Sequence, residues 1–324
     1  MNKNRTTQVY PEFKVLPMVQ PGGGKIDLQE IRTLARQGLG DYPPEDRTLA
    51  WLCMLEIYPE DPNKWRAVEA EKLRLYTEYV DYLGLVGWDQ KHIPDHTNFE
   101  TLGLKDPALM LSIHNDLIRT TKHLSNLSPY YLSTSKDIAN QLVLSVEGHI
   151  RKMERVLYIF ASINPALGYM QGFNELIQPI YYVIQAANTV IPDEFEVEAL
   201  TFFCLHQILS ATELNSLYTT QDKSIILQKL HSFDRLILKH VPLKAKILEQ
   251  GQIEPILYAY KWFSLLFCQE YSGKQLLEVW DGLLAHIDNL LDYEFYIGLA
   301  TIASRECQLT HLDPADIVQK VQEL

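Results

Sequence analysis

The chain has 324 residues, of which 47% are hydrophobic and 22% are charged. This is the balance of an ordinary globular protein, and a chain of this length can bury a sizeable core as one large domain or as two packed halves. The formal net charge of −12 argues against binding to nucleic acid or to an anionic membrane surface, because both depend on clustered Lys and Arg side chains.

The cysteines and the apolar segments indicate no special environment. The four cysteines are far apart and form no CxxC pair, so the sequence predicts neither a zinc site nor a redox motif and favours a reducing, cytoplasmic location. They are Cys53, Cys204, Cys268 and Cys307. The N-terminus lacks the apolar run of a signal peptide. The most apolar stretch, residues 176–191, is interrupted by polar side chains and predicts a buried helix rather than a transmembrane segment.

The first 25 residues differ from the rest of the chain. They are polar and contain three prolines, so we expect residues 1–25 to form a flexible tail. The run Gly22-Gly23-Gly24-Lys25 resembles a phosphate-binding loop, but that loop also needs an earlier glycine at fixed spacing and a Ser or Thr directly after the lysine. Val19 and Ile26 stand at those positions, which excludes such a loop.

From Asp27 onward the sequence predicts helices almost throughout, because caps and first-turn prolines recur ahead of apolar residues at helical spacing. No alternating strand or hairpin turn is present in the sequence, so the predicted fold class is all-α, and a break near Pro192 predicts two packed helical halves, about 26–190 and about 191–324. The first expected helices begin at Pro44, at Asp61-Pro62 (to about Tyr82), at Asp106-Pro107 (ending before Thr121) and at Ser135 (to Asn164). The buried helix at 176–191 follows, and the next helix begins at Pro192-Asp193. Later helices are expected at about 220–240, 254–271, 274–286, 292–307 and 313–323.

The first stretch that suggests chemistry is residues 113–120. Ile113, Asp116 and Arg119 are spaced three apart, so they share one stripe of a helix. Asp116 can then hold the guanidinium of Arg119 while Ile113 anchors the stripe in the core. Because the helix is expected to end before Thr121, Arg119 would project outward from the helix end. An ordinary Asp–Arg pair on a surface helix, worth only about 0.2–0.5 kcal/mol, would explain the same pattern.

The second stretch, residues 168–175, follows the helix that stops near Pro165. Gly168 and Gly172 bracket a short turn, and glycine allows tight backbone geometry and the close approach of another surface. The turn is expected to present Gln171, with Tyr169 packed beneath it. A plain connector between two helices with a polar tip is the alternative.

Other patterns are weaker. Arg47 and Trp51 are four apart on the helix opened by proline, a pattern that a helix start with one buried tryptophan would also explain. Trp262 and Trp280, which precedes Asp281, lie at helical spacing in later segments, where tryptophans are more often core than site. The sequence has no GxSxG, HExxH or GxGxxG motif, and its histidines are dispersed. A conventional hydrolase or a cofactor enzyme therefore has little support.

Taken together and in this order, these elements resemble the TBC-domain family of Rab GTPase-activating proteins. The family's IxxDxxR motif is present as Ile113, Asp116 and Arg119, and its YxQ motif as Tyr169 and Gln171. The similarity spans roughly residues 28–310. The remaining residues expected to support the site are Gly172, Asn174, Arg47 and Trp51, and Trp280-Asp281 matches the family's WD element. Lys261 beside Trp262 departs from the family, in which arginine is common there, and lysine lacks the planar fork for a bidentate contact.

The resemblance implies a TBC-domain fold over residues 26–324, with both motifs in the N-terminal half. It also implies that the chain accelerates GTP hydrolysis by a Rab-family small GTPase in its GTP-bound state, to which it supplies catalytic residues in trans. Arg119 would neutralise charge in the transition state of GTP hydrolysis, and Gln171 would orient the attacking water. The partner would carry the GTP and the Mg²⁺, so no cofactor of the chain's own is expected. Membrane association, including recruitment to endomembranes, would come only through that partner.

Two alternatives stay open at this point. One is a catalytically inactive TBC scaffold that binds a GTPase or an effector without hydrolysis. The other is an unrelated α-helical adaptor, which predicts an apolar groove and no clustering of Arg119 with Gln171. The TBC fold, by contrast, implies that these two side chains meet on an open face although they are distant along the chain.

Overall fold

The computed structural model describes residues 24–127, 138–187, 190–211, 214–219, 223–242 and 252–304, together with residues 245, 248 and 249; for a few of these, chiefly 121–127 and 138–146, it describes the backbone alone. Helices and their connecting loops make up these ranges, which contain no β-sheet, so the predicted all-α class is confirmed. Nearly all of the expected tail at 1–25 and the whole of the helix expected at 313–323 lie outside the described residues.

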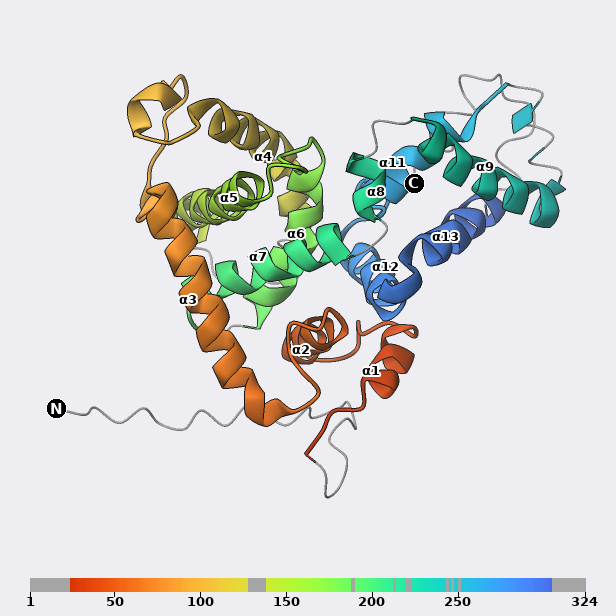
Figure 1. The fold of residues 1–324 in the computed structure, drawn as a ribbon, viewed down its shortest axis with the longest axis horizontal. Coiled ribbons are helices and arrows are strands. Elements are labelled where there is room, and N and C mark those ends of the chain that lie inside the picture. Colours follow the sequence, from red (N-terminus) through yellow and green to blue (C-terminus); the bar gives the residue numbers. More distant parts are fainter. Residues whose placement is uncertain are drawn as a thin grey trace.

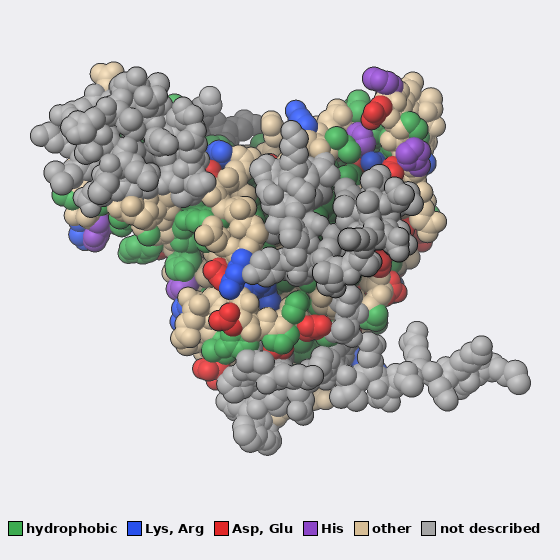
Figure 2. Space-filling model, turned by 180° about the vertical axis from the view of Figure 1, so that it is seen from behind, with side chains coloured by type: hydrophobic (Ala, Val, Ile, Leu, Met, Phe, Trp, Pro, Cys, Tyr) green, Lys and Arg blue, Asp and Glu red, His purple; other side chains and the backbone are tan. Residues whose placement is uncertain are grey.

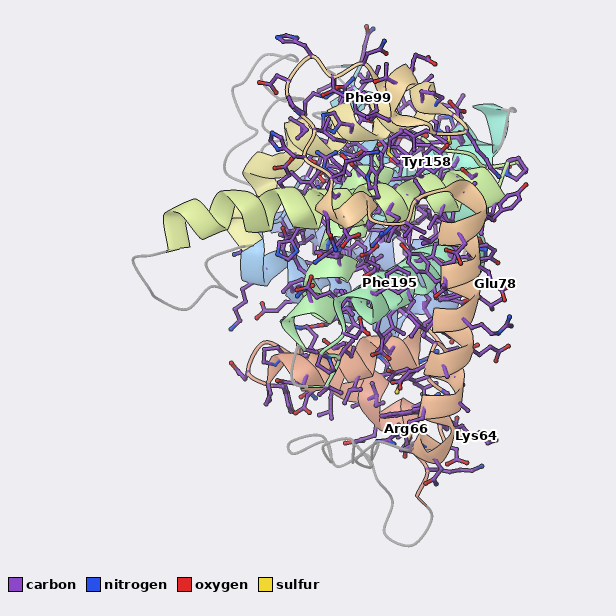
Figure 3. All side chains as sticks on the ribbon, turned by 90° about the vertical axis from the view of Figure 1, so that its left-hand side faces the viewer. Lys64, Arg66, Glu78, Phe99, Tyr158 and Phe195 are labelled. Carbon is purple, nitrogen blue, oxygen red and sulfur yellow. The ribbon has the colours of Figure 1, made fainter. Side chains whose placement is uncertain are left out.

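The first group of helices lies on the left of Figure 1. It comprises α3 (Trp65–Leu83), α4 (Pro107–Leu127), α5 (Ile138–Ile163), α6 (Phe173–Ala186) and α7 (Glu194–Ala211). The single turn η1 (Pro62–Lys64) precedes α3, and η2 (Trp88–Gln90) and η3 (Phe99–Leu102) lie between α3 and α4. Helix α7 packs against α3, α5 and α6, and α4 packs against α5 and α6. Figure 3 shows α3 along one edge, with Lys64 and Arg66 near its start, Glu78 on its outer side, and Tyr158 and Phe195 among the helices.

The second group is on the right of Figure 1, and the first two helices lie below both groups. The second group comprises α8 (Leu214–Thr219), α9 (Lys223–His240), η5 (Pro255–Leu257), α11 (Ala259–Ser264), α12 (Gly273–Ala285), η6 (Ile287–Asn289) and α13 (Leu290–Ser304). Helix α1 (Leu28–Ala35) packs against α2 (Pro44–Met54) and α12, and α2 packs against α6 and α12. The N-terminal helices thus close on an element from the last third of the chain.

Helix α7 begins just after the sequence break near Pro192 and packs with the helices that precede it. Helix α7 buries side chains around most of its circumference, including Val197, Leu200, Phe202 and Leu205. An apolar helix of this kind needs neighbours on several sides, and the first group supplies them.

Helix α4 is longer than predicted, because it continues past Thr121 to Leu127. The hydroxyl of Thr120 donates to the carbonyls of Asp116 and Leu117, at 3.1 and 3.0 Å, and so bonds to its own helix instead of ending it. The first proline after this point is Pro129. Arg119 therefore projects from the body of the helix, which corrects the expectation that it lies at the helix end.

The helix predicted over 254–271 is interrupted. It is replaced by η5, α11 and a turn in which Leu266 and Phe267 have φ angles of 48° and 59°. Such left-handed conformations cost non-glycine residues about 1–2 kcal/mol each. Both side chains are buried, which offsets that cost, and the N–H of Phe267 donates to the carbonyl of Trp262 at 2.9 Å to close the turn.

The surface is mixed in character. On the face shown in Figure 2, charged and apolar side chains are interspersed over the coloured, described atoms. Within the described ranges, none of the helices is long and apolar enough to cross a membrane.

Candidate functional site

The carboxylate of Asp116 joins the two predicted motifs. One of its oxygens accepts a hydrogen bond from Nη2 of Arg119, on the same helix. The other accepts a hydrogen bond from the hydroxyl of Tyr169 at 2.9 Å. Tyr169 lies in the loop between α5 and α6, two residues before Gln171. Helix α4 and the loop that carries Gln171 are therefore joined through a single buried side chain.

Arg119 is fixed at its base and open at its tip. Its Nε donates to the carbonyl of Asn115 at 3.2 Å, in addition to the bond with Asp116. Its side chain is nevertheless 68% exposed, whereas that of Asp116 is 7% exposed. Ile113 is fully buried and anchors the same stripe of α4, as the spacing predicts. A guanidinium held in this way loses little further freedom when it meets an anion.

Tyr169 acts as a permanent hydrogen-bond donor. Burial raises the pKa of its phenol well above the ordinary value, and the neighbouring negative charge of Asp116 raises it further. The hydroxyl therefore stays protonated at physiological pH and keeps donating to Asp116. The Tyr169 ring also contacts Phe173, the first residue of α6, edge to face at 6.1 Å between centroids.

The backbone after Gln171 is also fixed. Gly172 precedes α6 with a φ angle of 111°, a conformation that side-chain-bearing residues rarely adopt. Its N–H donates to Oδ1 of the buried Asn174 at 3.0 Å, and Nε2 of Gln178 donates to the Asn174 carbonyl at 2.8 Å. The side chain of Gln171 lies between these anchors and is exposed.

Arg47 and Trp51 lie in the core, away from any open surface. Nε and Nη2 of Arg47 donate to the two oxygens of Asp281 at 3.1 and 3.0 Å, and Nε1 of Trp51 donates to Oδ1 at 2.7 Å. The backbone N–H of Leu39 donates to Oδ2 at 2.8 Å. These residues fasten α2 to α12 within the core, and α2 in turn packs against α6, the helix that follows the loop of Gln171.

Lys261 is the residue at which the sequence departs from the family pattern. Its ammonium lies 3.4 Å from Oε1 of Glu270, whose carboxylate is buried. Burial raises the pKa of Glu270, and Lys261 opposes this rise. The lysine ammonium is a single charged point, whereas the planar guanidinium of an arginine could reach both carboxylate oxygens.

A cavity of about 900 Å³ lies beside α4, between that helix, α5 and residues 92–99. Its lining combines apolar side chains, among them Leu111, Ile118 and Ile150, with the polar side chains of His92, His114, Glu147 and Arg151. The hydrogen bonds that connect Arg119 to the loop of Gln171 argue against the unrelated helical adaptor.

Sequence reasoning finds Ile113, Asp116 and Arg119 as one local unit but misses the hydrogen bond from Tyr169 to Asp116. The first is a matter of helical spacing, whereas the second joins residues 53 positions apart and depends on how α4 and α6 pack. In the sequence, this hydrogen bond is indicated only by the tyrosine two positions before the glutamine. The YxQ motif does not show which residue that tyrosine bonds.

The sequence is similar to that of known proteins. The Rab-GTPase-TBC domain family matches residues 95–310, more than half of the chain. TBC1 domain family member 13 of Homo sapiens is 31% identical over 304 residues, which cover 91% of this chain and 73% of that protein. GTPase-activating protein gyp1 of Schizosaccharomyces pombe is 22% identical over 313 residues, which cover 92% of this chain and 54% of that protein.

Solved structures share the fold. The crystal structure of the Ypt/Rab-GAP domain of Gyp1p superimposes with a TM-score of 0.70 at 19% identity and covers 94% of this chain and 88% of that chain. The Chlamydomonas flagellar RabGAP TBC domain gives a TM-score of 0.59 at 16% identity, with 90% and 77% covered. From the matched family, the similar relatives and the shared arrangement of helices, we conclude that this chain belongs to the Rab-GTPase-TBC domain family.

Proposed function

We propose that this protein is a GTPase-activating protein for a Rab-family small GTPase in its GTP-bound state. The observation that carries the proposal is the carboxylate of Asp116, which holds Arg119 and binds the loop of Gln171 through Tyr169. Membership of the family supports it, as do relatives whose names describe GTPase activation. The protein would be cytoplasmic and would reach endomembranes through its Rab.

Arg119 neutralises the charge that develops on the phosphate oxygens as GTP is hydrolysed. An arginine supplied in trans accelerates this reaction by about 10³–10⁵-fold, equivalent to roughly 4–7 kcal/mol off the barrier. Asp116 and the Asn115 carbonyl hold the guanidinium before the partner arrives, so little conformational entropy is lost in the transition state.

Gln171 orients the water that attacks the γ-phosphate, in place of the glutamine of the GTPase itself. It does so by hydrogen bonds from a neutral carboxamide, so neither catalytic side chain has to change its protonation state. The partner carries both GTP and Mg²⁺, and this chain contributes side chains only.

The decisive experiment is single-turnover GTP hydrolysis by a panel of purified Rab GTPases. The wild-type chain should accelerate at least one of them by about 10³–10⁵-fold, and Arg119→Ala should abolish nearly all of the acceleration. Arg74→Ala is a matched control, because Arg74 is also an exposed helical arginine paired with an acidic residue of its own helix, Glu78. Full activity of the Arg119→Ala protein would show that Arg119 has been wrongly assigned.

Gln171→Ala tests the second residue separately. A loss of similar order is expected if Gln171 replaces the glutamine of the partner, and undiminished activity would remove Gln171 from the mechanism while leaving Arg119 in place. A wild-type chain that binds GTP-loaded Rabs without accelerating any of them would instead identify a catalytically inactive scaffold.

A further inference from the structure

The residue directly after Gln171 touches the C-terminal group of helices. A Cβ atom on Gly172 would lie 2.5 Å from Cδ2 of Leu265, which is closer than such atoms approach in real structures. Leu265 is itself only 8% exposed, so its side chain has little room to move aside. The backbone that presents Gln171 therefore rests against Leu265.

Leu265 belongs to a firmly held turn. It follows α11 directly, and the next two residues adopt the left-handed conformations described above. The Phe267 N–H donates to the Trp262 carbonyl at 2.9 Å, and Nε1 of Trp280 donates to the Leu266 carbonyl at 3.1 Å. The turn is thus bonded both to α11 and to α12, which makes it a rigid support.

Two further contacts join the same turn and its neighbours to the start of α6. Nε2 of Gln269 donates to Oε1 of Glu175 at 3.1 Å. The ring of Phe173 packs edge to face on Tyr218 of α8 at 5.0 Å, and the Tyr218 hydroxyl donates to the carbonyl of Ser264. Residues 172, 173 and 175 are therefore all in contact with the second group of helices.

The two sides of Gln171 are consequently anchored to different parts of the molecule. Tyr169, before it, is bound to Asp116 on α4, whereas Gly172, after it, rests on Leu265. The anchors of Arg119, by contrast, lie on α4 itself. A change at Leu265 should therefore move Gln171 and leave Arg119 where it is.

We propose that Leu265 and Gln269 are positioning residues that act on GTP hydrolysis through Gln171. This inference rests on the proposed function, since it assigns to the second group of helices a part in the glutamine step of that reaction. Neither residue needs to contact the partner, the nucleotide or the attacking water.

The test is a double-mutant cycle between Leu265→Ala and Gln171→Ala, measured as the single-turnover rate at saturating GAP concentration. We expect Leu265→Ala to lower this rate about tenfold, because a displacement of about 1 Å in a catalytic group can cost up to 10²-fold. The GAP concentration that gives half the maximal rate should change less than about twofold. In the Gln171→Ala background, Leu265→Ala should have no further effect, because residues that act through one group are not additive. An equal loss in both backgrounds, or no loss in the wild-type background, would overturn the proposal.

Two controls separate positioning from general damage. Leu230→Ala removes another buried leucine of the second group, from α9, and should lower stability without lowering the rate. Gln269→Ala changes an exposed side chain, so the protein should fold, and it should lower the rate by about two- to fivefold, again only when Gln171 is present.

The failure of this inference can be told apart from a failure of the proposed function. If Arg119→Ala retains activity, the proposed function fails; if Arg119→Ala is inactive and Leu265→Ala is unaffected, only the present inference fails.

Discussion

At the scale of single residues, the site depends on the two carboxylate oxygens of Asp116. One accepts a hydrogen bond from Arg119 and the other accepts a hydrogen bond from Tyr169. The spacing of Ile113, Asp116 and Arg119 predicts the first bond, because residues three apart on a helix are always neighbours. The bond with Tyr169 could not be predicted from spacing, because it requires α4 and α6 to be packed first. A carboxylate shared in this way joins α4 to the loop that carries Gln171.

Tyr169→Phe tests that sharing. The substitution keeps the ring and its contact with Phe173 but leaves one oxygen of a buried carboxylate without its donor, which typically costs about 1–3 kcal/mol. We expect a fall of that size in the free energy of unfolding in urea, and a loss of roughly tenfold in GAP-stimulated hydrolysis. Tyr82→Phe is the control, because Tyr82 is 71% exposed and should show neither change. Wild-type values for Tyr169→Phe would mean that the hydroxyl has no part in holding the loop.

His149 provides a pH prediction. Burial lowers its pKa to about 4, and its Nδ1 lies 2.6 Å from the Tyr181 hydroxyl. An unfolded histidine titrates near 6.5, so as the pH falls below that value the unfolded chain binds a proton that the folded protein does not. The free energy of unfolding should fall through this one group by about 2 kcal/mol between pH 7 and pH 5, and the loss should level off below about pH 4.

Urea unfolding of wild type and His149→Gln at the two pH values measures this contribution. Other groups titrate alike in both proteins, so the difference between the two losses isolates the histidine. Equal losses in the two proteins would show that His149 is not held neutral in the folded state.

At the scale of elements, the sequence locates most helices to within a few residues but misjudges how some of them end. Starts are marked by local chemistry, such as the proline at the first position of α2 and the aspartate before α1, whose side chain accepts from two N–H groups. The end of α4 and the break after α11 carry no comparable signal. The break depends on burying Leu266 and Phe267, which only the assembled fold makes possible.

The buried ion pair between α2 and α12 should contribute measurably to the free energy of unfolding. Asp281→Asn leaves the buried Arg47 without its counter-charge, and breaking a buried pair of this kind costs about 3–5 kcal/mol. Asp288→Asn is the matched comparison: Asp288 also accepts from an arginine of an N-terminal helix, Arg32, but its side chain is 66% exposed, so we expect a cost of about 0–1 kcal/mol. Chemical denaturation of both variants measures the difference, and comparable costs would show that burial does not set the strength of this ion pair.

At the scale of the whole molecule, the sequence predicts the fold class and the family, whereas the arrangement of the two groups comes from the structure. A break in the pattern near Pro192 looks like a boundary, yet α7 packs with the helices before it. In the same way, Arg47 and Trp51 are visible in the sequence as a motif, but only the position of Asp281 shows that they belong to the core. Leu265 carries no motif at all, and its relation to Gly172 follows from packing alone.

The cluster around Asp281 also bears on how the protein is made. Arg47 and Asp281 are 234 residues apart, and at a synthesis rate of about 5–20 residues per second the ribosome needs roughly 10–50 s to pass from one to the other. During that interval Arg47 and Trp51 have been synthesised, but Asp281, whose carboxylate accepts their hydrogen bonds in the folded protein, has not. A chain truncated before α12 would lack this carboxylate, so α2 would lose the hydrogen bonds that fasten it to the C-terminal part of the fold.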